Sequence, residues 1–352
     1  MKTDGRGRPS YVLQRAVSPV VLYDLVVTSL ASQTLVIGRA DSHRIPRNSN
    51  QTNAVDNPFG ARHFVASEDR SRVNSLAELA SARVKSLFGG RKKSIRGIAM
   101  LLNNKIAVIY GAGGPIGGAV ARAFAREGAK VFLTGRTLAK LTKLAKEITV
   151  AGGVAQTARV DAFDEKAVEK HAAAVVAQSG VIDVSFNAVG IVGSIQATPL
   201  IELSADDISL PVKNRVATNF LTAQVAARHM LTKRSGVILM ITATPARMAW
   251  PLTGSFGIEG AAIEGLCRSL ASELSPQGVR VICLRSAGSP ESFPDAPGKT
   301  REEITAMLAE RTLLGRPPLL AEVGNVAAFM ASDYASPMTA TVANITCGTI
   351  VD

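Results

Sequence analysis

A cluster of glycines just after residue 110 is the feature of this sequence best suited to a definite chemistry. Its members are Gly111, Gly113, Gly114 and Gly117. They follow the apolar run 106–110, which has the length and β-branched content of a buried strand, and they lead into small and apolar residues at helical spacing. Glycines let the backbone approach a diphosphate closely, and the free N–H groups at a helix start attract its charge. The cluster therefore predicts a dinucleotide site, with a plain strand-to-helix turn as the alternative.

The end of the next predicted strand, 131–134, indicates which dinucleotide fits. An NAD site usually has a carboxylate at this point, which holds the ribose hydroxyls. In this chain the strand is followed by Gly135 and Arg136. A guanidinium pairs with a 2′-phosphate, so we expect NADP and regard NAD as the weaker candidate. A solvated arginine without a ligand is the alternative interpretation.

The chain after residue 104 alternates regularly between predicted strands and predicted helices. The expected strands span 106–110, 131–134, 154–160, 181–186, 236–242, 279–284 and 341–345. The expected helices begin with the one after the glycine cluster and continue at 138–150, 165–178, 212–233, 253–274, 301–311 and 321–331. This alternation predicts the α/β class, a Rossmann-type doubly wound parallel sheet with helices on both faces. Ligands should then bind beyond the carboxyl ends of the strands.

Composition separates the first hundred residues from the remainder. The chain has 352 residues, of which 47% are hydrophobic and 5% aromatic, as in a globular protein. The first 100 residues carry 16 basic and 7 acidic residues, whereas the other 252 carry 24 and 21. We therefore predict a basic, disordered or non-native extension at 1–99 and an NAD(P)-binding domain at 100–352, with Met100 as a candidate natural start.

The same composition argues against several other classes of protein. The three cysteines and four histidines are too scattered for a metal site. An odd number of cysteines without a secretion signal favours reduced thiols and a cytoplasmic protein. No basic helix with interleaved aromatics is present, so we expect no nucleic-acid partner. The most apolar stretch of the first hundred residues is interrupted by Pro19 and Asp24, so we expect no membrane span.

Several motifs together resemble the short-chain dehydrogenase/reductase family, and the likeness covers nearly all of 100–352. YGAGGPIG (110–117) resembles the family's TGxxxGxG turn, and FNAVG (186–190) stands where the family has NNAG. Asp161 follows the third strand, where the family places an aspartate against the adenine. The ending LLGRPPLLAEVGNVAAFMASDYASPMTATVANITCG is similar to the family's final helix and strand. The expected cofactor-binding residues are Gly111, Gly113, Gly114, Ile116, Gly117, Arg136, Asp161, Asn187 and Gly190.

The resemblance also implies a mechanism whose groups this chain lacks. In the family a serine, a tyrosine and a lysine, helped by an asparagine, move a proton while NADPH gives a hydride. The serine position falls on Ala243, and the tyrosine and lysine positions fall on Phe256 and Gly260. The asparagine position falls on Arg215. Losing a general acid typically costs about 10²–10⁴ in rate.

Two ionisable residues near these positions are candidate catalytic substitutes. Glu259 lies three positions after Phe256, which places it within about 60° of the lost face of the predicted helix. Together with Arg215 it can form an acid and an oxyanion partner. An ion pair that simply joins two neighbouring helices is the alternative. Other polar residues expected nearby are Thr242, Thr244, Arg247 and Ser255.

Three functions remain open at this point. The first is an NADP-dependent oxidoreductase of the short-chain type that acts on a small carbonyl or alcohol substrate through a non-standard site. The second is a non-catalytic NADP-binding subunit or sensor, and the third is a structural partner that binds no nucleotide. The resemblance further implies a homodimer or homotetramer, assembled through the two long helices. The candidate contacts are Leu221, Ala227, Ala262, Leu266 and Leu270.

Overall fold

The computed structural model describes residues 100–190, 193–293 and 300–352. The extension predicted at 1–99 therefore lies outside the described residues. So do residues 294–299, which are part of the loop 286–299 that we expect, from its glycines and prolines, to cover the substrate.

The described domain is built on one parallel sheet of seven strands. The strands are β1 (Ile106–Tyr110), β2 (Lys130–Gly135), β3 (Val154–Arg159), β4 (Val184–Asn187), β5 (Gly236–Ala243), β6 (Val279–Ser286) and β7 (Thr341–Ile345). Their order is β3-β2-β1-β4-β5-β6-β7, and every neighbouring pair is parallel. The chain winds outward from β1 to β3 and then returns to place β4 beside β1. The predicted doubly wound α/β fold is confirmed, with its switch point between β1 and β4.

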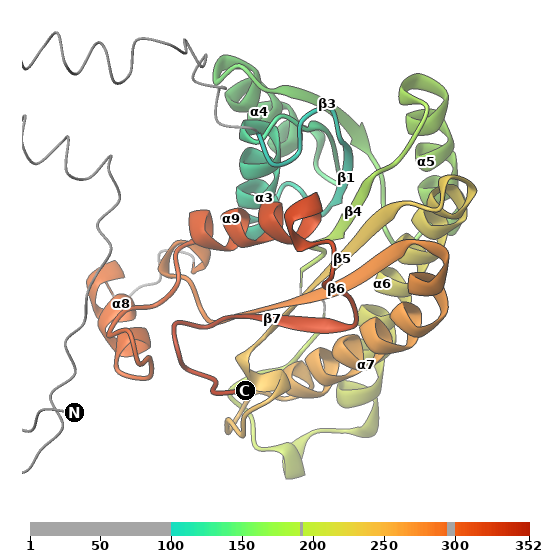
Figure 1. Ribbon diagram of the computed structural model, residues 1–352. Coiled ribbons are helices and arrows are strands. Elements are labelled where there is room, and N and C mark those ends of the chain that lie inside the picture. The colour runs from blue at the N-terminus through green and yellow to red at the C-terminus, as the bar shows by residue number, and fades with distance from the viewer. Residues whose placement is uncertain (1–99, 191–192, 294–299) are drawn as a thin grey trace, which may run out of the picture. The chain divides into compact units, whose positions relative to one another are not determined.

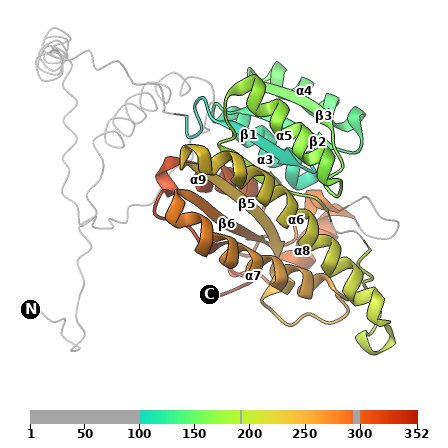
Figure 2. The same ribbon diagram turned by 90° about the vertical axis from the view of Figure 1, so that its right-hand side faces the viewer.

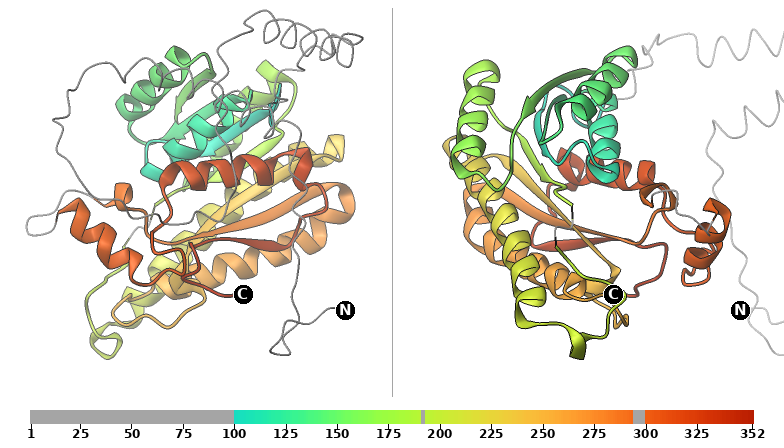
Figure 3. Two further views of the ribbon diagram at one scale, coloured as in Figure 1. Left: turned by 60° about the vertical axis from the view of Figure 1, so that its left-hand side comes forward. Right: turned by 180° about the vertical axis from the view of Figure 1, so that it is seen from behind.

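Helices cover both faces of the sheet, as Figure 1 shows. One face carries α3 (Pro115–Arg126), α4 (Leu138–Val150) and α9 (Leu320–Ala331), and the other carries α5 (Glu165–Ser179), α6 (Ala205–Lys233) and α7 (Phe256–Leu274). Figure 2 turns α6 and α7 toward the viewer, and the left view of Figure 3 brings α9 forward. The shorter α8 (Arg301–Ala309) follows β6.

Successive residues of each strand feed two separate cores, because side chains alternate between the faces of a sheet. Ile109 of β1 packs with Phe124 and Leu141 on the α3 side. Its neighbours Val108 and Tyr110 pack on the other side, among residues of α5, α6 and α7. Burial of apolar surface on both faces thus fixes the strand ends from which the site is built.

The predicted boundaries agree with the structure to within two residues except at β4, which begins at Val184 and not at residue 181, and at the two long helices. The helix α6 begins at Ala205, not at residue 212, because Ser204 and Asp207 form a capping box that starts it earlier. Pro211 is accommodated inside that helix. Conversely, α7 begins at Phe256 and not at residue 253, because Gly254 has a φ of +56°, which is incompatible with a right-handed helix.

The residues expected at a subunit interface have mixed exposure. Ala227 is buried in the core of its own chain, so its expected role as an interface contact is wrong. The other four candidates on α6 and α7 are half-buried. Among the described residues, no helix combines the length and the apolar character that crossing a membrane requires.

Candidate active site

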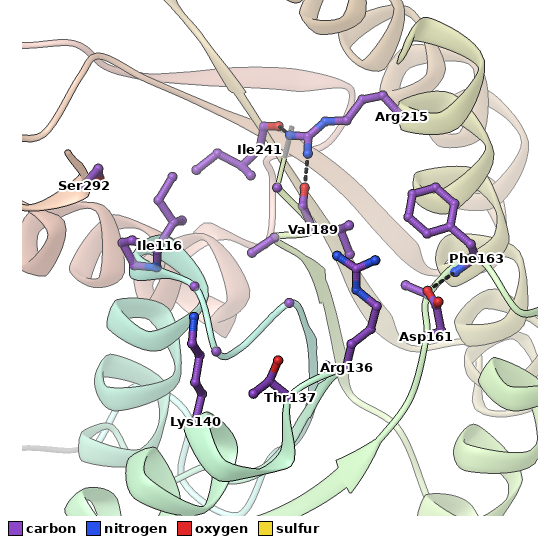
Figure 4. A pocket seen from close by; sticks show the side chains of 18 of the residues that line it. Ile116, Arg136, Thr137, Lys140, Asp161, Phe163, Val189, Arg215, Ile241 and Ser292 are labelled. Atoms are coloured by element: carbon purple, nitrogen blue, oxygen red, sulfur yellow. Dashed lines mark hydrogen bonds between the residues drawn. The ribbon is translucent and has the colours of Figure 1, made fainter. Parts of the chain in front are cut away.

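A pocket of about 490 Å³ lies at the carboxyl ends of the first five strands. It extends from the β1–α3 turn, past the loops that follow β2 and β3, to the ends of β4 and β5 and the first turns of α7. Figure 4 shows side chains from these separate segments pointing into one space. The pocket therefore spans the switch point, where a doubly wound sheet is expected to bind its ligand.

Two glycines of the cluster are required by close backbone contacts. Gly111 has a φ of +74°, and a Cβ there would stand 2.6 Å from the carbonyl oxygen of Ala188. A Cβ on Gly117 would overlap the carbonyl oxygen of Gly111. The absence of side chains thus lets the start of α3 approach β1 and lets β1 approach the loop after β4.

The first turn of α3 presents free hydrogen-bond donors to the pocket. Among the described residues, no acceptor is found for the main-chain N–H groups of Gly113, Ile116 and Gly117. Gly114 and Pro115 line the pocket beside them. A diphosphate fits this arrangement, because donors and the positive end of the helix dipole point at the same space.

Most of the predicted cofactor-binding residues lie together in this pocket. The seven that line it are Gly111, Gly113, Gly114, Ile116, Arg136, Asp161 and Gly190. Gly117 lies just behind them in α3. Asn187 is also outside the lining: it is 3% exposed, donates to Thr218 O and to Thr222 Oγ1, and accepts from Val189 N–H. Asn187 therefore holds the loop after β4 in place through its bonds to α6 and to Val189.

The sequence analysis missed two polar residues at the nucleotide end. Thr137 and Lys140 line the pocket beside Arg136, and Figure 4 shows the Lys140 side chain extending from α4 toward the same space. The sequence could have predicted both residues, because the first turn of the helix after β2 must lie at the same edge of the sheet as Arg136. The pocket therefore has three polar side chains near this strand end and no carboxylate on the residues following β2.

The positions of the family's serine, tyrosine and lysine face the other end of the pocket. In the alignment expected from the sequence these positions carry Ala243, Phe256 and Gly260, and all three residues line the pocket. The present backbone leaves no room for a side chain at position 260, because a Cβ on Gly260 would stand 2.7 Å from the Cβ of Ala246. A Cβ on Gly257 would likewise stand 2.8 Å from the carbonyl oxygen of Pro245. The 3₁₀ turn Thr244–Ala246 thus packs directly on α7.

Arg215 lies between the ends of β4 and β5 and does not form the ion pair with Glu259 that was the alternative reading. One terminal nitrogen donates to the carbonyl oxygen of Val189, and the other donates to that of Ile241 over 2.9 Å. Figure 4 shows both bonds. Burial lowers the pKa of Arg215, and the nearby charge of Glu259 opposes that shift. The guanidinium therefore joins two strand ends at the edge of the pocket.

Glu259 is a buried carboxylate that lines the pocket and accepts a hydrogen bond from one hydroxyl group. It is 2% exposed, and its Oε1 accepts from Ser255 Oγ over 2.8 Å. Ser255 is itself fully buried and lies 3.1 Å from Ser194 Oγ in the loop after β4. Among the described residues, no donor is found for Glu259 Oε2. That oxygen is available to a group bound in the pocket.

A second buried carboxylate on the same helix, that of Glu264, has both oxygens engaged in hydrogen bonds. Glu264 forms a two-bond pair with Arg285, with N–O distances of 2.8 and 2.9 Å, and also accepts from Thr242 Oγ1 over 3.1 Å. The side chains of Glu264 and Arg285 are 8% and 4% exposed. The Glu264 carboxylate raises the pKa of Arg285, and Asp352 adds a second partner. This network ties α7 to the ends of β5 and β6.

The remaining polar residues near the site have other surroundings. Thr244 is buried in the turn before α7, and Arg247 is exposed. Tyr110 is 2% exposed in β1, where burial raises its pKa, so it is no substitute for the family's tyrosine. Within the described part of the chain, no three His, Cys, Asp or Glu residues gather closely enough to hold a metal ion.

Known proteins resemble this chain over the same region. The family model described as enoyl-(acyl carrier protein) reductase matches residues 111–349. The oxidoreductase UcpA of Salmonella typhimurium is 30% identical over 250 residues, which are 68% of this chain and 92% of UcpA. The chain belongs to the short-chain dehydrogenase/reductase family.

Solved structures of this family share the fold. A dehydrogenase/reductase from Sinorhizobium meliloti 1021 is 25% identical, with a TM-score of 0.63, and the match covers 72% of this chain and 98% of that one. A xylitol dehydrogenase with bound NAD⁺ is 24% identical, also with a TM-score of 0.63, over 70% of this chain and 99% of the other. The short-chain dehydrogenase/reductase fold thus accounts for the whole described domain.

Proposed function

We propose that this member of the short-chain dehydrogenase/reductase family is an NADP-dependent oxidoreductase that interconverts a carbonyl and an alcohol. The observation that carries the proposal is the continuity of the pocket, which runs from the free N–H groups of α3 to the carboxylate of Glu259. One ligand lying along it would meet a diphosphate site at one end and an acid at the other. Family membership makes a nicotinamide dinucleotide the expected occupant.

Residues at the glycine-rich end of the pocket offer partners for the diphosphate, the adenine and the 2′-phosphate of the cofactor. The N–H groups of Gly113 and Ile116 would hold the diphosphate, and Asp161 would lie near the adenine. Arg136, with Thr137 and Lys140 beside it, would hold the 2′-phosphate of NADP. The bound cofactor supplies or accepts a hydride.

The chain's own contribution to the reaction is a proton at the substrate oxygen. Glu259 Oε2 faces the pocket without a donor among the described residues, so this carboxyl group is placed to exchange a proton with the substrate oxygen in either direction. Ser255 holds the other carboxyl oxygen and fixes its orientation. Arg215 has further N–H groups beyond the two that hold Val189 and Ile241, and these can stabilise negative charge on the substrate oxygen.

Nucleotide binding tests the first half of the proposal. Calorimetric titration of the full chain with NADP⁺ and NAD⁺ should show tighter binding of NADP⁺. The variant R136A should lose about 10- to 100-fold in affinity for NADP⁺, because a charge-assisted hydrogen bond contributes about 1.5–3 kcal/mol. Its affinity for NAD⁺ should change little. Equal losses for both nucleotides would contradict the assignment of NADP.

Hydride transfer tests the second half. Oxidation of NADPH should be followed with a panel of ketones and aldehydes, together with a 2-enoyl thioester because the matching family model is described by that substrate class. The variant E259Q, which keeps the shape of the side chain, should lose about 10²–10⁴ in rate. Unchanged turnover in E259Q would exclude Glu259 as the acid.

A non-catalytic NADP-binding subunit or sensor is the second candidate, favoured by one observation. Ala243, Phe256 and Gly260 together remove the family's proton-transfer groups. This candidate predicts NADP binding without turnover across the panel. Turnover above the uncatalysed rate would exclude it.

We also propose that the chain assembles as a homodimer or homotetramer through α6 and α7, as the family resemblance implies. Half-buried apolar residues of these helices, such as Leu266 and Leu270, are the available contacts. Sedimentation equilibrium should give at least twice the chain mass of 36.8 kDa. A monomer at micromolar concentration would refute this proposal.

A further inference from the structure

The end of the pocket formed by β5 and α7, here called the inner end, has few polar side chains among the described residues that are free to bind a substrate. Its polar lining residues are Arg215, Thr242, Glu259 and Ser292. Thr242 Oγ1 is held by Glu264, and two N–H groups of Arg215 are held by main-chain carbonyls. What remains among the described residues are further donors of Arg215, one oxygen of Glu259, and Ser292.

The free groups of Arg215 and Glu259 serve one position. Arg215 and Glu259 both line this end of the pocket, and the charge of Glu259 acts on the Arg215 guanidinium. A donor and a carboxyl oxygen directed to the same space match a single substrate oxygen, at the carbon that changes oxidation state. Few polar partners are left for a second or third oxygen.

The other side chains at this end are apolar. They are Ile116, Val189, Ile241, Ala243 and Phe256. Two of them replace groups that carry hydroxyls in the family, since Ala243 and Phe256 stand at the serine and tyrosine positions. A hydroxyl placed against this wall would lose its water without gaining a partner, which costs about 1–3 kcal/mol each.

Apolar side chains also lie exposed on the loops next to this end. The main chain joins the loop after β4 to the loop before α7 through Ala197 N–H, which donates to Leu252 O over 2.9 Å. Ile195 and Leu252 on these loops are 38% and 48% exposed, and Phe293, directly after Ser292, is 39% exposed. These three residues lie outside the pocket lining, and apolar groups on the loops beside a pocket favour an apolar ligand.

We infer that the substrate is a largely apolar ketone or secondary alcohol with one oxygen at the reacting carbon, and that polyols and sugars are excluded. The inference rests on the proposed function and extends it. In the reductive direction the carbonyl carbon gains the hydride of NADPH and the carbonyl oxygen gains the proton of Glu259, giving the alcohol and NADP⁺. Glu259 then regains a proton from water. This substrate class differs from the polyol in the name of the related xylitol dehydrogenase.

Isothermal titration calorimetry tests the inference through binding affinity, without a measurement of turnover. The full chain is first titrated with NADP⁺, and the NADP⁺ complex is then titrated with 2-nonanone and with D-xylulose. We expect 2-nonanone to bind at least about 100-fold more tightly, a ratio that corresponds to about two unpaired hydroxyls. The variant A243S, which restores one hydroxyl to the wall, should reduce this ratio about tenfold. The matched control A139S, on the exposed side of α4, should leave it unchanged.

The outcomes separate the two proposals. Failure of NADP⁺ to bind would overturn the proposed function and this inference with it. Normal NADP⁺ binding with D-xylulose bound as tightly as 2-nonanone, or more tightly, would overturn the substrate class alone. An unchanged ratio in A243S would also contradict the inference, because the wall would then not be what rejects the sugar.

Discussion

Two pairs of glycines, at opposite ends of one pocket, permit close backbone contact for different purposes. At the nucleotide end, Gly111 and Gly117 let β1, the start of α3 and the loop after β4 approach one another, and the space in front of them stays open. At the other end, Gly257 and Gly260 let the turn Thr244–Ala246 pack on α7, and the turn itself occupies the space. The same residue type leaves a cradle in one region and a filled contact in the other.

From this difference we propose that the second region is rebuilt and has not simply lost its chemistry. A site that had only decayed would keep a hole where the family's lysine stands. Here Ala246 packs against Gly260, the residue that we align with that lysine, and two buried carboxylates with different partners lie on α7. Glu264 is neutralised by Arg285, whereas Glu259 is held by Ser255 and faces the pocket. On this proposal Glu264 stabilises the fold of α7, and Glu259 takes part in the reaction.

The largest expected effect separates these two carboxylates. The variant E264A leaves Arg285 buried with only Asp352 as a partner, and breaking a buried pair in this way costs about 3–5 kcal/mol of stability. The variant E259A loses one hydrogen bond and should cost about 1 kcal/mol. Urea denaturation followed by circular dichroism measures both. Equal losses would mean that Glu259 is as much a structural residue as Glu264.

The next effect tests the open cradle. In G111A the new Cβ would lie 2.6 Å from Ala188 O at a positive φ, which pushes the two loops apart. Overpacking of about 1–3 kcal/mol should weaken NADP⁺ binding about 10- to 100-fold. The matched control is G180A, which has a similar φ of +77° and open space around the Cβ, and which should bind NADP⁺ normally. Equal affinity of the two variants would show that the cradle does not hold the nucleotide.

A smaller effect tests the filled contact on α7. The variant G260A places a Cβ 2.7 Å from Ala246 and should lower the free energy of unfolding by about 1–3 kcal/mol. In contrast, G265A on the same helix meets nothing closer than 3.9 Å and should raise it by about 0.5–1 kcal/mol. Opposite signs in thermal or urea unfolding are therefore expected. For the same reason, F256Y combined with G260K should not restore activity by the family's route, and a gain in turnover would disprove the rebuilt site.

The smallest expected effect is a change in the pH dependence of stability at His171, which lies away from both regions. Stability measurements on the two regions should therefore be compared above about pH 6.5. Burial beside Phe132 lowers the pKa of His171 in the folded chain below its unfolded value near 6.5. The folded state therefore binds fewer protons, so this contribution to stability is complete above about pH 6.5 and is lost as the pH falls. The variant H171L should show a shallower loss of stability between pH 7 and pH 5. An identical slope in both proteins would remove His171 from the account.

Most of the fold could be predicted because its signals are local. Alternating apolar runs and helical periods located every strand, and β1, α4 and β7 agree with their predicted bounds. The predicted start of α6 at residue 212 was wrong, because the capping box at Ser204 starts the helix seven residues before Pro211. A cap decides where a helix begins, and a proline within the helix can be tolerated when neighbouring contacts outweigh the lost bond.

The candidate site was less predictable because its contacts join distant segments. The glycine cluster and Arg136 carry motif signals, and both line the pocket. No periodicity shows that Arg215 donates to the ends of two strands, or that Ala246 packs against Gly260. The four-residue spacing of Ser255 and Glu259 on one helix was readable, since such residues share a face. Their link to Ser194 depends on how two loops meet.

A structure of the full chain with NADP⁺ and a ketone tests the central claim most directly. The claim predicts the diphosphate at the N–H groups of Gly113 and Ile116, with the carboxyl of Glu259 within about 3 Å of the ketone oxygen. A diphosphate bound elsewhere would contradict the nucleotide half of the claim. A different side chain within hydrogen-bond reach of that oxygen, with Glu259 turned away from it, would contradict the catalytic half.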